Sequence, residues 1–225
     1  MSELETKINF IFHDGDLLKE ALTHRSYLNE HPEWSVPHNE RMEYLGDAVL
    51  ELAVTEYLYH KFPELPEGQL TVLRAALVNY QHLAKSASDI DLNRFILMSK
   101  GERSDNSKAK EVILANAFEA LVGAMYLDQG FPPCEKFVRD FVLPALPEIL
   151  KTGSYRDPKS ELQEIIQERL KTTPSYKVLE ETGPAHKRVF RIGVYFGEEK
   201  IAEGEGMSKQ EAEAEAAKKA LSQYR

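Results

Sequence analysis

Residues 38–59 read HNERMEYLGDAVLELAVTEYLY, and this stretch decides the fold of the first part of the chain. Its apolar residues recur at the three- and four-residue spacing of a helix, which predicts one long helix. Four acids share one face of that helix, Glu40, Glu43, Asp47 and Glu51. The opposite face carries Met42, Leu45, Val49 and Leu52. An amphipathic helix with a solvated acidic side is one interpretation of this pattern.

Two features of the acidic face favour a different interpretation. Like charges four residues apart, such as Glu43 and Asp47, each cost about 0.2–0.5 kcal/mol, and no lysine on that face offsets them. Apolar residues, Tyr44 among them, also flank the acids, so we expect the carboxylates to be partly desolvated. A divalent cation would neutralise such a cluster. Oxygen ligands without histidine or cysteine indicate Mg²⁺, with Mn²⁺ as its substitute.

A second helix is predicted over Val112–Leu127, VILANAFEALVGAMYL, where Asn116 and Glu119 are the strongly polar side chains. Their i, i+3 spacing places them on one face, and burying an unpaired carboxylate is costly. One interpretation is a core pair whose hydrogen bonds are satisfied by another side chain. The other brings this helix against the acidic helix, so that both sets of oxygens bind one metal site. That arrangement suits phosphodiester hydrolysis.

Composition and charge indicate a two-part globular protein. Apolar residues make up 42% of the chain and charged residues 29%, which excludes wholesale disorder. No run of about 20 apolar residues predicts a membrane span, and the N-terminus lacks the pattern of a secretory signal, so we expect a cytoplasmic protein. The single cysteine, Cys134, is interpreted as an apolar filler. Residues 1–150 carry a net charge of −10 and residues 151–225 a net charge of +1.

Helix-interrupting residues around 151–157 predict a linker there, between a helical domain at residues 1–150 and a second domain at residues 158–225. The second domain is expected to run α-β-β-β-α, with a helix at Ser160–Leu170, strands at Tyr176–Glu181, Val189–Phe196 and Lys200–Glu205, and a last helix from Lys209 to Gln223. The overall class is therefore α+β. Ser208 and Glu211 form a capping box at the start of the last helix, and Lys209 beside free backbone N–H groups predicts a phosphate site.

Four strings of sequence resemble bacterial ribonuclease III. NERMEYLGDAVL resembles that family's signature, and ILANAFEALVGAMYLD resembles its second motif. LTHRSYLNE and FPELPEGQLTVLRAALVN resemble the flanking segments in the same order. The resemblance implies a homodimeric, magnesium-dependent endoribonuclease that makes staggered cuts in double-stranded RNA, leaving 5′-phosphate and 3′-hydroxyl ends. It implies no membrane partner and no small-molecule cofactor beyond the metal.

Residue by residue, the family's metal-binding carboxylates map onto Glu43, Asp47 and Glu119. Glu40 and Glu67 map onto further acids of the catalytic valley.

Two other positions of the helical domain bear on function. Tyr44 matches the aromatic residue that inserts into the partner subunit. Where the commonly described motif has aspartate, this sequence has Asn116, whose amide oxygen can ligate metal but brings no charge. A rival interpretation is therefore a double-stranded-RNA-binding regulator that folds and dimerises in the same way but does not cut.

The strings DPKSELQEIIQE, ETGPAHKRVF and GMSKQEAEAEAAKKAL resemble a double-stranded-RNA-binding domain. In that comparison Gln163 and His186 match the residues that reach 2′-hydroxyl groups, which DNA lacks. Lys209 and Gln210 match the phosphate-binding helix start, and Lys218 is a further phosphate contact or a solvated charge.

Overall fold

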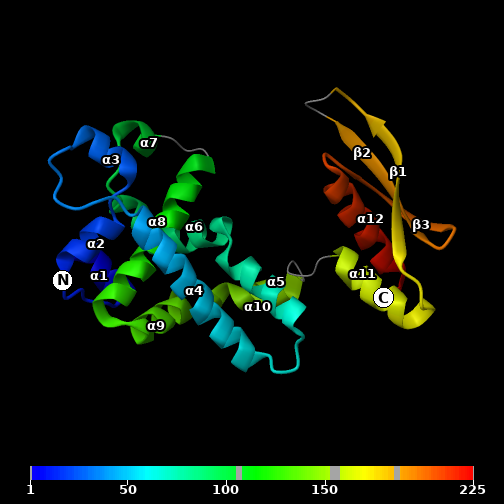
Figure 1. Ribbon diagram of the computed structural model, residues 1–225, viewed down its shortest axis with the longest axis horizontal. Coiled ribbons are helices and arrows are strands. Elements are labelled where there is room, and N and C mark those ends of the chain that lie inside the picture. Colours follow the sequence, from blue (N-terminus) through cyan, green and yellow to red (C-terminus); the bar gives the residue numbers. More distant parts are fainter. Residues whose placement is uncertain (1, 105–107, 153–157, 185–187, 225) are drawn as a thin grey trace. The chain divides into compact units, whose positions relative to one another are not determined.

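The fold of the first part of the chain is built around two long helices, α4 (Glu40–Lys61) and α8 (Lys108–Gln129), which cross at its centre (Figure 1). The computed structural model describes residues 2–104, 108–152, 158–184 and 188–224. The chain divides into two units, Met1–Tyr155 and Arg156–Arg225, and each is described by itself. The predicted linker, residues 151–157, lies mostly outside the described residues.

Shorter helices surround α4 and α8 in the first unit, and in its described part no strand pairs into a sheet. They are α1 (Glu3–Ile8), α2 (Gly15–Ala21), α3 (Arg25–Glu30), α5 (Glu67–Val78), α6 (Tyr80–Asp89), η1 (Leu92–Arg94), α7 (Lys100–Ser104), α9 (Phe131–Phe141), η2 (Leu143–Ala145) and α10 (Leu146–Thr152). No helix in the described part of the chain is long and apolar enough to cross a membrane.

The α4 and α8 backbones touch where they cross, and two glycines make this possible. A Cβ atom added to Gly46 would lie 1.8 Å from the carbonyl oxygen of Glu119, and one added to Gly123 would lie 2.3 Å from the carbonyl oxygen of Met42. Any side chain at either position would push the helices apart. The crossing therefore fixes which side chains of α4 and α8 meet.

The prediction for the apolar face of α4 was partly wrong. Met42 and Val49 are buried as expected, but Leu52 is 55% exposed. The buried side of α4 instead continues through Ala53, Val54 and Leu58, which pack in the core. The reason is that α8 and α9 cover α4 at an angle, so the covered stripe drifts around the helix from one end to the other.

The second unit has the predicted α-β-β-β-α order. Helix α11 (Pro158–Leu170) precedes β1 (Pro174–Thr182), β2 (Val189–Phe196) and β3 (Glu199–Gly206), and α12 (Lys209–Tyr224) ends the described chain. The three strands form one antiparallel sheet in the order β1-β2-β3. Both helices pack on the sheet, and their apolar side chains form a separate core with Val194 and Phe196 (Figure 1).

Helix α12 lies directly on β3, which fixes the position of its N-terminus. A Cβ atom added to Gly204 would lie 2.2 Å from the carbonyl oxygen of Ala212. Ser208 caps the helix by accepting a hydrogen bond from the Glu211 N–H at 3.1 Å. The Glu211 carboxylate accepts from the Met207 N–H at 2.8 Å, one residue before the donor that a capping box predicts.

Candidate active site

The crossing of α4 and α8 brings four oxygen-bearing side chains together. Glu43 and Asp47 lie one turn apart on α4, and Asn116 and Glu119 lie three residues apart on α8. The Asn116 amide lies close enough to the Glu43 carboxylate to lower its pKa, as a hydrogen-bond donor does. Asp47 and Glu43 in turn both act electrostatically on Glu119. Residues that are far apart in the sequence thus meet at one place.

The charges in this cluster are unfavourable in the absence of a cation. Burial, followed by repulsion from Asp47 and Glu43, raises the pKa of Glu119 to about 8. Burial also raises the pKa of Glu43, as do the neighbouring Glu40 and Asp47, while the hydrogen bond from Asn116 opposes this rise. A raised pKa means that the surroundings of a carboxyl group disfavour its negative charge, through burial and through neighbouring negative charges. A bound cation would supply that partner.

The donor set fits a divalent cation of the hard type. All four side chains offer oxygen, the ligand atom preferred by Mg²⁺ and Mn²⁺. Asn116 and Glu119 are half-buried rather than buried, so solvent can complete a coordination shell. Within the described residues no three acidic, histidine or cysteine side chains already stand in a closed metal-binding arrangement. The carboxylates would therefore have to come closer together to bind an ion, and Asp47 is exposed at the surface of α4.

The two other acids expected at the site lie at different distances from it. Glu40 is exposed at the start of α4. Its charge raises the pKa of Glu43, which indicates that Glu40 borders the cluster. Arg25 at the start of α3 forms an ion pair with Glu40 at 3.3 Å. Glu67 instead begins α5 and accepts a hydrogen bond from the Thr71 hydroxyl at 3.0 Å. No sequence pattern pointed to Arg25, since its position depends on how α3 docks beside α4.

Helix α4 also carries a stripe of exposed apolar side chains. Tyr44 is 84% exposed, Leu52 55% and Tyr59 67%. Their spacing of eight and seven residues places them along one side of the helix. Large apolar side chains that line up on a surface mark an interaction site more often than scattered ones do. We call this set the α4 stripe.

A cavity of about 440 Å³ lies beside the C-terminal end of the α4 stripe. Leu58, Leu65 and Leu70 supply apolar walls, and Arg74 donates a hydrogen bond to the Thr55 hydroxyl at 3.1 Å. The remaining lining residues are Tyr59, Glu67 and Thr71.

In the second unit, the residues expected to bind RNA are solvent-accessible. Gln163 on α11 and Lys209, Gln210 and Lys218 on α12 are all exposed. Lys209 lies over the ring of Phe190, 5.7 Å from its centre, so its charged end stands at the start of α12. His186 lies outside the described residues.

Comparison with known proteins assigns both units. The sequence pattern of Ribonuclease-III-like proteins matches residues 14–146, and the Double-stranded RNA binding motif matches residues 158–224. The chain belongs to the ribonuclease III family. It is 44% identical to Ribonuclease 3 of Enterococcus faecalis and 43% identical to that of Nitratiruptor sp., each over 98% of this chain and 95% of the relative.

A solved structure agrees with this assignment. The nuclease domain of ribonuclease III from Campylobacter jejuni superimposes with a TM-score of 0.59 at 42% identity, covering 65% of this chain and 98% of that one. That structure is described as showing flexibility in a region involved in dimer formation.

Family membership supplies the activity. The chain is an endoribonuclease of the ribonuclease III type that carries a double-stranded-RNA-binding domain, and the family depends on metal.

Proposed function

We propose that this ribonuclease III cuts both strands of double-stranded RNA at a centre formed by Glu43, Asp47, Asn116 and Glu119 with Mg²⁺, which Mn²⁺ can replace. The cuts are staggered and leave 5′-phosphate and 3′-hydroxyl ends. The observation that supports the proposal most strongly is the close crossing of α4 and α8 at Gly46 and Gly123, which brings Glu119 beside Glu43 and Asp47. We place the reaction in the cytoplasm.

Each residue of the cluster has a distinct task in this proposal. When bound, the magnesium ion lowers the pKa of water and stabilises negative charge on the attacked phosphate. Glu119 and Asp47 hold the ion from opposite helices and lose their mutual repulsion when it binds. Asn116 donates its N–H₂ group to Glu43, which favours the ionised form of Glu43 and leaves the Asn116 carbonyl oxygen available as an acceptor. Glu40, at the edge of the cluster, is proposed as a further catalytic acid.

Asn116 therefore lowers the pKa of Glu43 although it carries no charge itself. An aspartate in its place would add a negative charge but would repel Glu43 instead of donating to it. In the metal-free protein Asn116 thus favours the ionised form of Glu43, whereas the added charge of an aspartate would strengthen the binding of a cation once one is present. Three carboxylates still remain for a divalent ion, and on this basis we favour a cleaving enzyme over the non-cleaving regulator.

The α4 stripe supports a homodimer. Tyr44 lies eight residues before Leu52, and Tyr59, which lines the cavity, lies seven residues after it. If two copies of α4 pack antiparallel about a twofold axis at Leu52, each Tyr44 meets the cavity of the other copy. Such a surface is self-complementary, as a twofold interface must be.

The second unit is proposed to hold the duplex. Lys209, Gln210 and the N–H groups at the start of α12 address phosphates, and Lys218 adds a further phosphate contact. Gln163 and His186 address 2′-hydroxyl groups and so distinguish RNA from DNA.

The test is cleavage of a long, perfectly paired RNA duplex by the full-length protein, with the product ends analysed. We expect magnesium-dependent cutting, 5′-phosphate and 3′-hydroxyl ends, and no cutting of the same sequence as duplex DNA. Binding of the RNA duplex without cutting at any magnesium or manganese concentration would favour the regulator instead.

A further inference from the structure

Arg25 is an exposed cation beside the acidic cluster. Its guanidinium lies 3.3 Å from one carboxylate oxygen of Glu40, at the edge of the cluster, and 70% of its side chain is exposed. Within the described residues it forms no hydrogen bond. An ion pair between two exposed side chains contributes little to stability, so the contact with Glu40 does not explain why an arginine stands here.

The backbone fixes the position of Arg25 independently of that ion pair. The Thr23 carbonyl oxygen accepts a hydrogen bond from the Asn39 N–H at 2.9 Å. The buried side-chain amide of Asn39 donates to the Ala21 carbonyl oxygen at 3.1 Å. These bonds tie the chain just before α3 to the chain just before α4. They hold Arg25 near Glu40 whether or not the two side chains attract each other.

The positive charge of Arg25 does not serve the residues proposed to bind the metal. The neighbouring charges that act on Glu43 are those of Glu40 and Asp47. Those that act on Glu119 are Asp47 and Glu43. Arg25 is absent from both sets, so it does not neutralise these carboxylates. Its charge is therefore available to a ligand that arrives from solvent.

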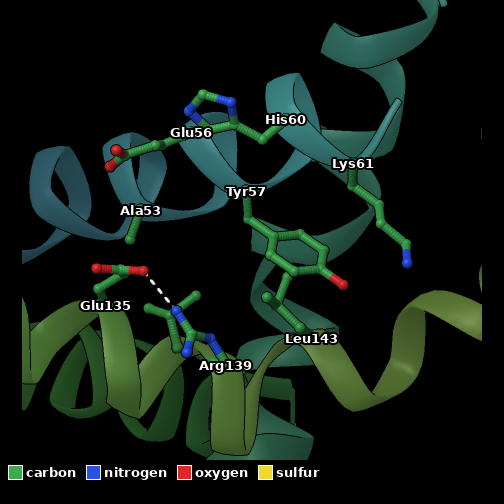
Figure 2. A pocket seen from close by; sticks show the side chains of 9 residues that line it. Ala53, Glu56, Tyr57, His60, Lys61, Glu135, Arg139 and Leu143 are labelled. Carbon is green, nitrogen blue, oxygen red and sulfur yellow. Dashed lines mark hydrogen bonds and ion pairs between the residues drawn. The ribbon is translucent and has the colours of Figure 1, made fainter. Parts of the chain in front are cut away.

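Other arginines of the first unit are held by hydrogen bonds. A groove of about 330 Å³ between the C-terminal half of α4 and helix α9 is lined by Arg139, which donates to Glu135 at 2.5 Å (Figure 2). Arg94 donates to Glu3 at 2.8 Å. In both cases a carboxylate takes up part of the donor capacity of the guanidinium. The N–H donors of Arg25 are not occupied in this way within the part of the chain that the structure describes.

The RNA substrate carries a ligand that suits Arg25. A phosphodiester bound at the acidic cluster has a further phosphate on each side of it along the same strand. Glu40 and Glu43 are about 5–6 Å apart between their Cβ atoms. Arg25 contacts Glu40 without acting on Glu43, so it stands about one side chain further out. An arginine at that place reaches a neighbouring phosphate and not the phosphate under attack.

We propose that Arg25 binds the RNA phosphate next to the one held at the acidic cluster, and so positions the strand for cutting. This inference rests on the proposed function, because it takes RNA as the substrate of that cluster. The guanidinium presents a planar fork of N–H donors that matches two phosphate oxygens. RNA binding replaces its contact with Glu40. Glu40 then still has His38 as a neighbour, whose Nδ1 lies 3.8 Å from the other carboxylate oxygen.

The test uses the full-length protein and a set of RNA duplexes. In each duplex one phosphate of one strand is replaced by an uncharged methylphosphonate, and the replaced position moves along the strand through the set. Dissociation constants are measured in chelator, where the duplex stays intact, and KM and kcat are measured in magnesium. The proteins compared are the unchanged chain, Arg25→Ala, Arg25→Lys and the matched control Arg94→Ala, which removes an exposed, paired arginine elsewhere.

One position of the neutral linkage should single out Arg25. There the linkage should weaken binding by the unchanged protein on the order of tenfold and leave binding by Arg25→Ala unaffected. On the unmodified duplex, Arg25→Ala should bind more weakly by the same factor, with a salt slope reduced by about 0.9. It should raise KM more than it lowers kcat. Arg25→Lys should fall between the two, because lysine supplies the charge but not the fork. Arg94→Ala should behave as the unchanged protein.

A second variant separates phosphate binding from a role exerted through Glu40. If Arg25 only positioned Glu40, its removal would have no effect on binding once Glu40 is replaced. We expect Arg25→Ala to weaken binding by the same factor in a Glu40→Gln background as in the unchanged one. Loss of the effect in that background would overturn the proposal.

The proposal is also overturned if every position of the neutral linkage affects Arg25→Ala as much as it affects the unchanged protein. Failure of the proposed function looks different. A protein that shows the expected binding pattern but cuts no RNA in magnesium retains the Arg25 contact and is not a cleaving enzyme.

Discussion

Replacing Gly46 by alanine tests whether the close crossing of α4 and α8 creates the active site. The added Cβ would lie 1.8 Å from the Glu119 carbonyl oxygen, whereas ordinary contacts begin at 3.4 Å. The obstructing atom is backbone, so no side-chain rotation relieves the clash. The helices must separate by roughly 1.6 Å at this point, which moves Glu119 away from Glu43 and Asp47.

Two effects of this separation can be estimated. Overpacking a core costs about 1–3 kcal/mol, which for a chain of this length lowers the unfolding midpoint by about 2–12 °C. A displacement of about 1 Å at a catalytic centre costs on the order of 100-fold in rate. Gly46→Ala should therefore lose far more activity than its loss of stability explains.

The assay compares magnesium-dependent cleavage at a temperature where both proteins are folded, together with thermal unfolding. Gly15→Ala is the matched control, because a Cβ at Gly15 would meet nothing within 4 Å. It should leave cleavage unchanged. Cleavage by Gly46→Ala within about threefold of the unchanged protein would mean that the close crossing does not position the active site.

Three further predictions concern Glu119, Tyr44 and Lys209. Burial and repulsion raise the pKa of Glu119 from 4.5 to about 8. Between these two pH values the metal-free native chain keeps a proton on Glu119 that the unfolded chain releases. The native chain therefore loses stability as the pH rises from 4.5 to 8. With a chelator present to remove metal, Glu119→Gln should therefore be more stable than the unchanged protein at pH 8, by about 1–2 kcal/mol after discounting for solvent screening. At pH 4.5 it should be no more stable. Equal unfolding midpoints of the two proteins at pH 8 would contradict this prediction. Tyr44→Ala should weaken dimerisation by about 1–4 kcal/mol in sedimentation equilibrium, and a monomeric unchanged protein at micromolar concentration would exclude the proposed interface. Lys209→Ala should weaken binding of RNA duplexes and reduce its salt dependence, while an unchanged salt slope would remove Lys209 from the phosphate contacts.

Local sequence patterns predicted the helices and strands, and also the polar residues of the cluster at the α4–α8 crossing. The three- and four-residue spacing of apolar residues indicated α4 and α8, and alternation with turn residues indicated the three strands. Asn116 and Glu119 stood out because they are polar within an apolar helix. Their meeting with Glu43 and Asp47 was inferred from chemistry, and the structure does place the four together.

Features that depend on packing between distant segments were not predictable in this way. The helical spacing of apolar residues did not predict that Leu52 is exposed. The covered side of α4 is set by the angle at which α8 and α9 cross it, and the sequence of α4 does not contain that angle. The ion pair between Arg25 and Glu40 depends on the docking of α3. The groove between α4 and α9 likewise arises from two helices whose sequences are ordinary when each is considered alone.

A magnesium titration of RNA cleavage shows whether α4 and α8 together form a magnesium-dependent cleavage centre. The unchanged protein, Asn116→Asp and Glu119→Gln are compared on one perfectly paired RNA duplex. We predict that the unchanged protein cuts, and that Asn116→Asp lowers its magnesium requirement by a factor on the order of ten, since ligand charge tunes the affinity for the ion. Glu119→Gln should be far less active than either. Cleavage that Glu119→Gln leaves unchanged would mean that the cluster at the α4–α8 crossing is not the cleavage centre.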